Sequence, residues 1–240
     1  MKALILAAGR GTRINGVLNG KNKCLTMAGD KPIIGHALDK LGEVKEIESF
    51  VIVVGYKAGT VIDYCGYEHN GRKITYVFQE ELKGLVNAME CAGDSLGGED
   101  FILHLGDEFF EAPDYAGMLK RFYHEACYSL IGTVRVNNTS LIKKTYTFSH
   151  NQEEEVCNLI EKPAQVYNNL MGTGNIMFRA GILDYISKTP VNPIRQEKDL
   201  TDLILTAIRD GNRVKFFELA KKYVNLNIPE DMEELQVWLQ

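Results

Sequence analysis

Glycines and arginines follow the first apolar run of the chain, which begins MKALILAAGRGTR. Gly9 and Gly11 allow the backbone to come close to a ligand, so that its N–H groups can point at phosphate oxygens. Arg10 and Arg13 add positive charge, and a guanidinium group can hold a phosphate through two parallel hydrogen bonds. These residue types at this spacing predict a loop that binds phosphate or triphosphate.

Two familiar glycine-rich loops do not fit this stretch. A dinucleotide fingerprint needs a third glycine, whereas Arg13 is followed by Ile14. A Walker loop needs a lysine after its last glycine, whereas Gly16 is followed by Val17. A plain tight turn would be the better interpretation of an isolated Gly-x-Gly, but here the match extends over LAAGRGTR and is followed by the lysines of KNKCL.

A carboxylate stands in a comparable position later in the chain. Asp107 follows the apolar run FILHL and a glycine. A carboxylate at the carboxyl end of a strand can hold Mg²⁺ against phosphate groups. Gly-Asp pairs also occur in ordinary turns, but the buried strand expected before Asp107 favours the metal site.

These side chains need a rigid sheet to bring them together. Short runs rich in Val, Ile, Leu and Phe alternate with helical stretches, which predicts an α/β fold with a mostly parallel, mixed central sheet and helices on both faces. Strands are expected at 2–7, 50–54, 74–78, 101–105, 128–134, 156–160, 175–178 and 214–217. Helices are expected at 32–43, 57–65, 84–95, 114–125, 180–187, 199–210 and 229–238.

The arrangement of the chain suggests one domain over residues 1–240 with two functional halves. In an open parallel sheet, ligands bind beyond the carboxyl ends of the strands, and the glycine loop lies at such an end. We expect residues 1–110 to bind the nucleotide and residues 111–240 to bind the acceptor. No linker, internal repeat or low-complexity segment divides them.

Composition excludes several classes of protein. The net charge of −5 argues against a general nucleic-acid binder. The sequence shows neither a membrane-spanning run nor a signal-peptide profile. The five cysteines are scattered without a CxxC pair, so reduced thiols in a cytoplasmic protein are expected, without a disulfide framework or a zinc site. The oligomeric state stays open, with a homo-oligomer allowed.

The combination of LAAGRGTR with the lysines of KNKCL resembles the sugar-1-phosphate nucleotidyltransferases, which join a nucleoside triphosphate to a sugar 1-phosphate. The resemblance implies a Rossmann-like nucleotidyltransferase (GT-A-like) architecture. In that family the loop wraps the triphosphate and the lysine contacts phosphate, a role carried here to Lys23 with Lys21 in support. It implies nucleotide binding by Leu6, Ala7, Ala8, Gly9, Arg10, Gly11, Thr12 and Arg13.

The resemblance continues at three later stretches of the nucleotide side. QEELKGLVNAM is similar to the segment that recognises the base, which implies base contacts for Gln79 and Gly84. Asp107 matches the magnesium ligand of the family. YVNLNIPED is similar to a stretch in which an aspartate is the second ligand. The uridylyltransferase branch that acts on N-acetylglucosamine 1-phosphate has asparagine there, so Asn225 takes the role, while those of Glu108 and Asn227 stay open.

The acceptor side carries its own matches. VCNLIEKP is similar to the stretch in which a glutamate contacts sugar hydroxyls and a lysine contacts the sugar phosphate, here Glu161 and Lys162. MGTGNIMF resembles the next sugar-site segment, which implies acceptor contacts for Gly172, Thr173 and Asn175, with Gly174 in the same glycine-rich stretch. EKDLTDLILTAI resembles a helix of the same enzymes, in which we expect Asp199 and Asp202 to cap and brace the helix.

Together these residues imply a Mg²⁺-dependent transfer of a nucleotidyl group that releases pyrophosphate. The acceptor phosphate has a second pKa of about 6, so it is a nucleophile at neutral pH without a general base. Arg13, Lys23, Asp107 and Lys162 are the predicted catalytic residues. One alternative is a small cytidylyltransferase that uses CTP with choline phosphate or a phosphonate. A second is a non-catalytic nucleotide or sugar-phosphate sensor, which the presence of Lys23 and Asp107 disfavours.

Overall fold

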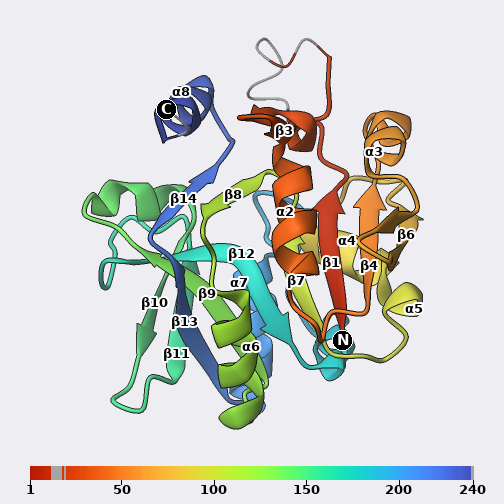
Figure 1. Ribbon diagram of the computed structural model, residues 1–240. Coiled ribbons are helices and arrows are strands. Elements are labelled where there is room, and N and C mark those ends of the chain that lie inside the picture. Colours follow the sequence, from red (N-terminus) through yellow and green to blue (C-terminus); the bar gives the residue numbers. More distant parts are fainter. Residues whose placement is uncertain (12–17, 19, 239–240) are drawn as a thin grey trace.

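Four parallel strands form the amino-terminal half of the central sheet in a computed structural model, which describes residues 1–11, 18 and 20–238 (Figure 1). They are β1 (Lys2–Ala7), β4 (Ser49–Val54), β6 (Arg72–Phe78) and β7 (Phe101–Leu105), in the spatial order β7-β1-β4-β6. Leu6 of β1 lies opposite Leu105 on one side and Val53 on the other. The carboxyl ends of these strands therefore meet along one edge of the sheet.

The carboxyl-terminal half extends the same sheet, largely with antiparallel pairs. β12 (Leu170–Phe178) joins the halves because it pairs antiparallel with both β7 and β9 (Ser129–Arg135). β13 (Val214–Ala220) pairs parallel with β9, and β10 (Tyr146–His150) links β12 to β11 (Val156–Glu161). Among the described residues, the result is one open sheet of ten strands with β5 (Glu68–His69) at one edge.

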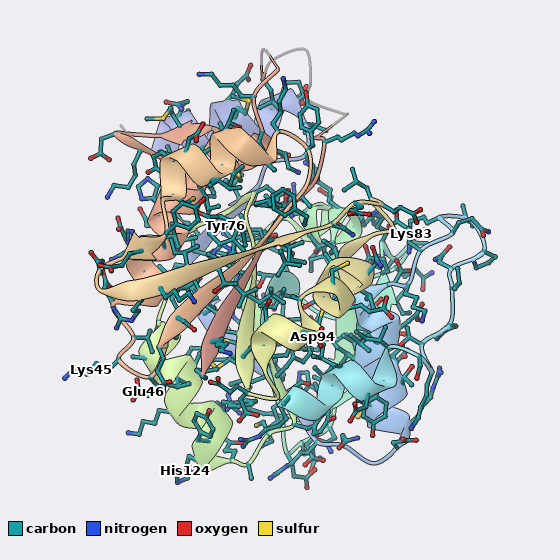
Figure 2. The ribbon with its side chains drawn as sticks, turned by 90° about the vertical axis from the view of Figure 1, so that its right-hand side faces the viewer. Lys45, Glu46, Tyr76, Lys83, Asp94 and His124 are labelled. Carbon is teal, nitrogen blue, oxygen red and sulfur yellow. The ribbon has the colours of Figure 1, made fainter. Side chains whose placement is uncertain are left out.

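Helices cover both faces of the sheet (Figures 1 and 2). β1 shows why, because its residues alternate between two buried clusters: Ala3 and Ile5 belong to one, Leu4 and Leu6 to the other. The first cluster receives side chains from α2 (Ile33–Gly42), α3 (Ala58–Cys65) and α6 (Tyr115–His124). The second receives them from α4 (Leu85–Cys91), α5 (Gly93–Leu96), η4 (Ala180–Tyr185) and α7 (Leu200–Arg209). The α/β class with a mixed sheet covered on both faces is confirmed.

Short elements complete the carboxyl-end edge. β8 (Glu108–Glu111) pairs antiparallel with β14 (Lys222–Asn225), which places Asn225 opposite Glu108. A small buried cluster that includes Phe109, Val224 and Leu235 packs α8 (Pro229–Trp238) against this pair. The remaining elements are η2 (Lys23–Leu25), β2 (Met27–Ala28), β3 (Lys31–Pro32) and η3 (Thr139–Lys144).

The structure differs from the expected elements in several short strands and in two helices. The strands β2, β3, β5, β8, β10 and β14 lie outside the predicted set, and β12 and β13 are longer than expected. The helix expected over 84–95 divides at Ala92 into α4 and α5, and the one over 180–187 is the 3₁₀ helix η4. Within the part of the chain that the structure describes, no helix is long and apolar enough to cross a membrane.

Candidate active site

A cavity of about 460 Å³ opens at the carboxyl ends of β1, β6 and β7. One wall comes from the glycine loop, the segment around Lys23 and the turn at Asp107. The facing wall comes from β11, β12 and the segment that leads into α7. Of the described residues nominated from the sequence, all but Lys21 and Asn175 line this cavity: Leu6, Ala7, Ala8, Gly9, Arg10, Gly11, Lys23, Gln79, Gly84, Asp107, Glu161, Lys162, Gly172, Thr173 and Asn225.

The glycine loop leaves β1 at the cavity floor. Ala7 and Ala8 are buried, whereas Gly9 and Arg10 are exposed at the cavity. Gly11 has φ +60°, and a Cβ there would lie 3.3 Å from Cβ of Lys23. The position therefore favours glycine both for its backbone conformation and for the close approach of the Lys23 segment. Thr12 and Arg13, which the sequence also nominates, lie outside the described residues.

Asn22 fixes the segment that carries Lys23. Its side-chain amide donates hydrogen bonds to the carbonyl oxygens of Ala7 (2.9 Å) and Tyr56 (2.7 Å) and accepts one from the N–H of Cys24 (3.1 Å). The buried amide thus joins the ends of β1 and β4 to η2. Lys23 lies on the cavity wall as a result, whereas Lys21 is exposed and does not line the cavity.

Lys23 and Asp107 form an ion pair. Asp107 stands in the turn between β7 and β8. The N–H of Gly106 in this turn donates a hydrogen bond to the carbonyl of Leu6 (2.9 Å), which holds the turn against β1. The side chains of Lys23 and Asp107 are 15% and 20% exposed, so both can reach a bound ligand. A cation and an anion that two distant segments supply therefore meet beside the phosphate-binding loop.

Asn225 lies next to Asp107, since the N–H of Leu226 donates to the carbonyl of Asp107 (3.1 Å). Its Oδ1 is buried and accepts no hydrogen bond from the described residues. An unpaired buried oxygen is costly unless a donor or a cation satisfies it. Within the described ranges, no cluster of three or more His, Cys, Asp or Glu side chains is placed to hold a metal ion. One carboxylate with one amide oxygen suits Mg²⁺ that takes its other ligands from phosphates and water.

The base-side residues form a small hydrogen-bonded unit. Gln79 is buried at the end of β6, and its amide nitrogen donates to the carbonyl of Gly84 (3.1 Å) and to Oδ1 of Asn87 (2.9 Å). No described residue donates to Oε1 of Gln79, so this oxygen is the atom left for a ligand. Gly84 has φ +88°, and a Cβ there would meet the carboxylate of Glu197 at 2.5 Å.

Glu161 and Lys162 stand at the end of β11 on the facing wall. Lys162 adopts φ +45°, which its N–H supports by donating to the carbonyl of Thr145 (2.7 Å). Its ammonium group lies 3.9 Å from the carboxylate of Glu161 and remains largely exposed. Burial raises the pKa of Glu161 to about 7, against a smaller lowering by Lys162. The pair therefore presents a cation beside a carboxyl group that titrates near neutrality.

The glycine-rich stretch of β12 lies on the facing wall, together with Glu161 and Lys162 of β11. Gly172, Thr173 and Gly174 line the cavity, and the Thr173 hydroxyl donates to the carbonyl of Gly132 (2.8 Å). Asn175 differs from the expectation. It is fully buried, donates to Glu108 (2.9 Å) and accepts from the hydroxyl of Tyr115 (2.9 Å). The structure gives its side chain these internal partners and no place on the cavity wall.

Several cavity residues were missed from the sequence. Arg195, Glu197, Lys198 and Lys144 line the cavity, and only their tertiary position reveals them. Asp199 begins α7 without a side-chain capping hydrogen bond and is instead ion-paired with Arg195. Asp199 therefore stands at the N-cap position that the sequence predicted, but its side chain does not cap the helix.

Glu108 is the buried group whose role the sequence left open. It accepts hydrogen bonds from the N–H of Gly174 (2.9 Å), from Nδ2 of Asn175 (2.9 Å) and from the hydroxyl of Tyr223 (2.7 Å). Burial raises its pKa to about 8, and the bond from Tyr223 opposes this shift.

The arrangement of the two walls can bring two anionic substrates together. One wall offers backbone N–H groups, Arg10 and Lys23 beside Asp107 and Asn225. The other offers Lys162, Glu161 and Arg195. The cations can neutralise phosphates on both sides, which is the main requirement when one phosphate displaces another.

The chain is similar to known proteins over its whole length. A family model described as Nucleotidyl transferase matches residues 2–238. The UTP–glucose-1-phosphate uridylyltransferase AglF of Haloferax volcanii is 32% identical over 243 residues, which cover all of this chain and 97% of that protein. The bifunctional protein GlmU of Methanocaldococcus jannaschii is 28% identical over 239 residues, which are all of this chain but 54% of that protein. A crystal structure of UDP-glucose pyrophosphorylase with UDP-glucose superposes with a TM-score of 0.86 at 23% identity, over 99% of this chain and 97% of that one.

Proposed function

The chain belongs to the nucleotidyl transferase family, and from that premise we propose that it transfers a uridylyl group from UTP to glucose 1-phosphate or a closely related sugar 1-phosphate. It is a nucleotidyltransferase whose relatives make nucleotide sugars, so this acceptor class is favoured over choline phosphate and over a sensor without activity. The observation that carries the proposal is a single cavity between the glycine-loop wall and the Glu161–Lys162 wall.

Roles follow from the two walls. We assign the triphosphate to the wall of residues 1–110 and the sugar phosphate to that of residues 111–240. The backbone of Ala8–Gly11 and the side chains of Arg10 and Lys23 face the triphosphate. Lys162 holds the acceptor phosphate and Glu161 accepts hydrogen bonds from sugar hydroxyls. These assignments extend the sequence-based prediction to residues that share one cavity.

The reaction is a displacement at phosphorus. An oxygen of the sugar phosphate forms a bond to the α-phosphorus of the nucleotide, and the bond from that phosphorus to the bridging oxygen breaks. Pyrophosphate leaves with the electron pair. Because the acceptor is already anionic, with a second pKa of about 6, no side chain has to remove a proton. Positioning and charge neutralisation are therefore the tasks of this chain.

Asp107 and Asn225 would hold a divalent ion such as Mg²⁺, which fits their unpaired amide oxygen and adjacent carboxylate. When bound, the ion supplies positive charge to the phosphates during the displacement. Lys23 must then turn from Asp107 toward a phosphate, since the ammonium group and the ion compete for the same carboxylate.

Gln79 favours uracil or thymine over cytosine. Its amide nitrogen is already engaged by Gly84 and Asn87, so Oε1 faces the base. Uracil and thymine offer a ring N3–H that this oxygen can accept, whereas N3 of cytosine carries a lone pair. Uracil is preferred here because of the relative AglF.

The test is a screen of pyrophosphate release. UTP, dTTP, CTP and GTP are each combined with glucose 1-phosphate, N-acetylglucosamine 1-phosphate and choline phosphate, with and without Mg²⁺. We expect the highest kcat/KM with UTP and a sugar 1-phosphate, and loss of turnover in Asp107→Ala. Turnover with CTP and choline phosphate alone would refute the assignment.

A further inference from the structure

β12 contains an irregularity at the point where it meets the cavity. Its register with β9 shifts between Gly172, which lies opposite Thr133, and Ile176, which lies opposite Ile131. Three residues of β12 therefore span one residue of β9. Such a bulge leaves backbone groups outside the ladder and redirects the strand. Here it turns the backbone of residues 172–174 toward the cavity.

Glu108 satisfies the polar groups that the bulge leaves free. One carboxylate oxygen accepts the N–H of Gly174, and the other accepts Nδ2 of Asn175, both at 2.9 Å. The first oxygen also accepts the hydroxyl of Tyr223 at 2.7 Å. Glu108 is only 2% exposed, so water replaces these contacts poorly. One side chain thus joins β8, β12 and β14.

The same residue neighbours both proposed metal ligands. Asp107 precedes it in the chain, and Asn225 lies opposite it in the β8–β14 ladder. A shift of Glu108 therefore moves the acceptor wall relative to both ligands. Space is also tight, because a Cβ on Gly174 would lie 2.2 Å from Cγ of Leu105 and 3.0 Å from Oε2 of Glu108.

We infer that Glu108 is a positioning residue that fixes the bulge of β12, and with it the acceptor, relative to Asp107 and Asn225. The inference rests on the proposed function for its kinetic consequence, but its structural consequence is independent of activity. Misplacement of reacting groups by about 1 Å can cost a hundredfold in rate. The expected defect therefore concerns the acceptor, whereas the triphosphate-binding loop keeps its own supports.

The test compares Glu108→Gln and Glu108→Ala with Glu111→Gln. Glu111 is a matched control, since it is on the same strand and bridges β8 to β14 through an ion pair with Lys222 (3.0 Å), but it is exposed and does not line the cavity. We expect Glu108→Ala to lose about a hundredfold in kcat/KM for the sugar 1-phosphate. The affinity for UTP, measured by calorimetry, should change less than about threefold, and Glu108→Gln should lose less because it keeps one oxygen acceptor.

Hydrogen exchange supplies a readout that needs no turnover. The amides of residues 170–178 should exchange faster in both Glu108 variants and at the wild-type rate in Glu111→Gln. If Glu108→Ala does not fold, Tyr223→Phe removes one of the three hydrogen bonds and should show the same acceptor-specific defect to a smaller degree.

Two results would overturn the inference. In the first, the Glu108 variants have the same kcat/KM for the sugar 1-phosphate and the same hydrogen exchange of residues 170–178 as Glu111→Gln. The other is an equal loss of UTP and acceptor binding, which would indicate general destabilisation. If wild type and Glu111→Gln both fail to release pyrophosphate, the proposed function has failed, and the exchange of residues 170–178 still decides whether Glu108 fixes the bulge.

Discussion

Replacing Lys23 by methionine should separate catalysis from folding. Methionine keeps most of the apolar stem that packs near Gly11, so the change removes a charge with little loss of contact. The side chains of the ion pair with Asp107 are only 15% and 20% exposed, so breaking it should cost more than the ~1 kcal/mol of a surface pair and less than the ~3–5 kcal/mol of a fully buried pair. A positioned charge that stabilises the transition state is typically worth about 3 kcal/mol, or about a hundredfold in kcat.

The assay measures pyrophosphate release and urea unfolding of Lys23→Met beside Lys21→Met. Lys21 carries the same charge two residues earlier, but it is exposed and off the cavity wall. We expect kcat of Lys23→Met to fall about a hundredfold or more, while the unfolding free energy falls by about 1–3 kcal/mol and the protein stays folded. Lys21→Met should lose less than about threefold.

Loss of Lys23 should also expose the carboxylate of Asp107 to cations. Without nucleotide, Mn²⁺ followed by electron paramagnetic resonance should bind Lys23→Met about tenfold more tightly than wild type, a difference of about 1.4 kcal/mol. A variant with kcat within threefold of wild type would remove Lys23 from the site. Unchanged Mn²⁺ affinity together with the kinetic loss would show that Asp107 does not bind the ion.

Three further predictions follow from the same geometry. Asn225→Asp should tighten Mn²⁺ binding in the absence of nucleotide, because a carboxylate replaces the unpaired amide oxygen. Asn225→Leu, which supplies no oxygen ligand, should greatly reduce turnover. Identical metal titrations for wild type and both variants would leave Asn225 as a turn residue. Burial raises the pKa of Glu161 from an ordinary value near 4.5 to about 7, so the folded state binds this proton more tightly than the unfolded chain does. The resulting contribution to the free energy of unfolding is present below about pH 4.5 and is lost as the pH rises to about 7. Urea unfolding of Glu161→Gln should lack this pH-dependent component. Gly174→Ala should lower the free energy of unfolding by about 1–3 kcal/mol, since its Cβ meets Leu105. Gly9→Ala, whose Cβ has no atom of the described residues within 4 Å, should unfold like wild type, and equal urea midpoints for the two variants would contradict the packing argument.

The sequence by itself determined the elements that carry a local signal. The apolar run before Gly9 and the one before Asp107 each had to form buried strands, and strands that alternate with helices had to form a largely parallel sheet. Parallel strands end at the same edge, so the nominated residues at those ends could be expected to meet. The cavity contains fifteen of the nominated residues, from Leu6 to Asn225, most of which were nominated through the family resemblance.

Side-chain partners were decided only by the tertiary structure. Nothing local distinguishes Asn175 from a ligand-binding asparagine, and its burial follows from Glu108 and Tyr115, which are 67 and 60 residues away in the chain. The sequence placed Lys23 and Asp107 in one site, but their ion pair in the free protein depends on how Asn22 joins η2 to β1.

The strands β8 and β14 show the physical reason most clearly. Each has only four residues, too few for a periodic pattern, and each forms because the other lies beside it across more than a hundred residues of chain. Their pairing brings Asn225 beside Asp107 and the Tyr223 hydroxyl against Glu108, whose other two donors come from β12. Local residue types therefore determined which groups could bind phosphate, metal and sugar, and long-range strand pairing decided which of them face the cavity and which support it.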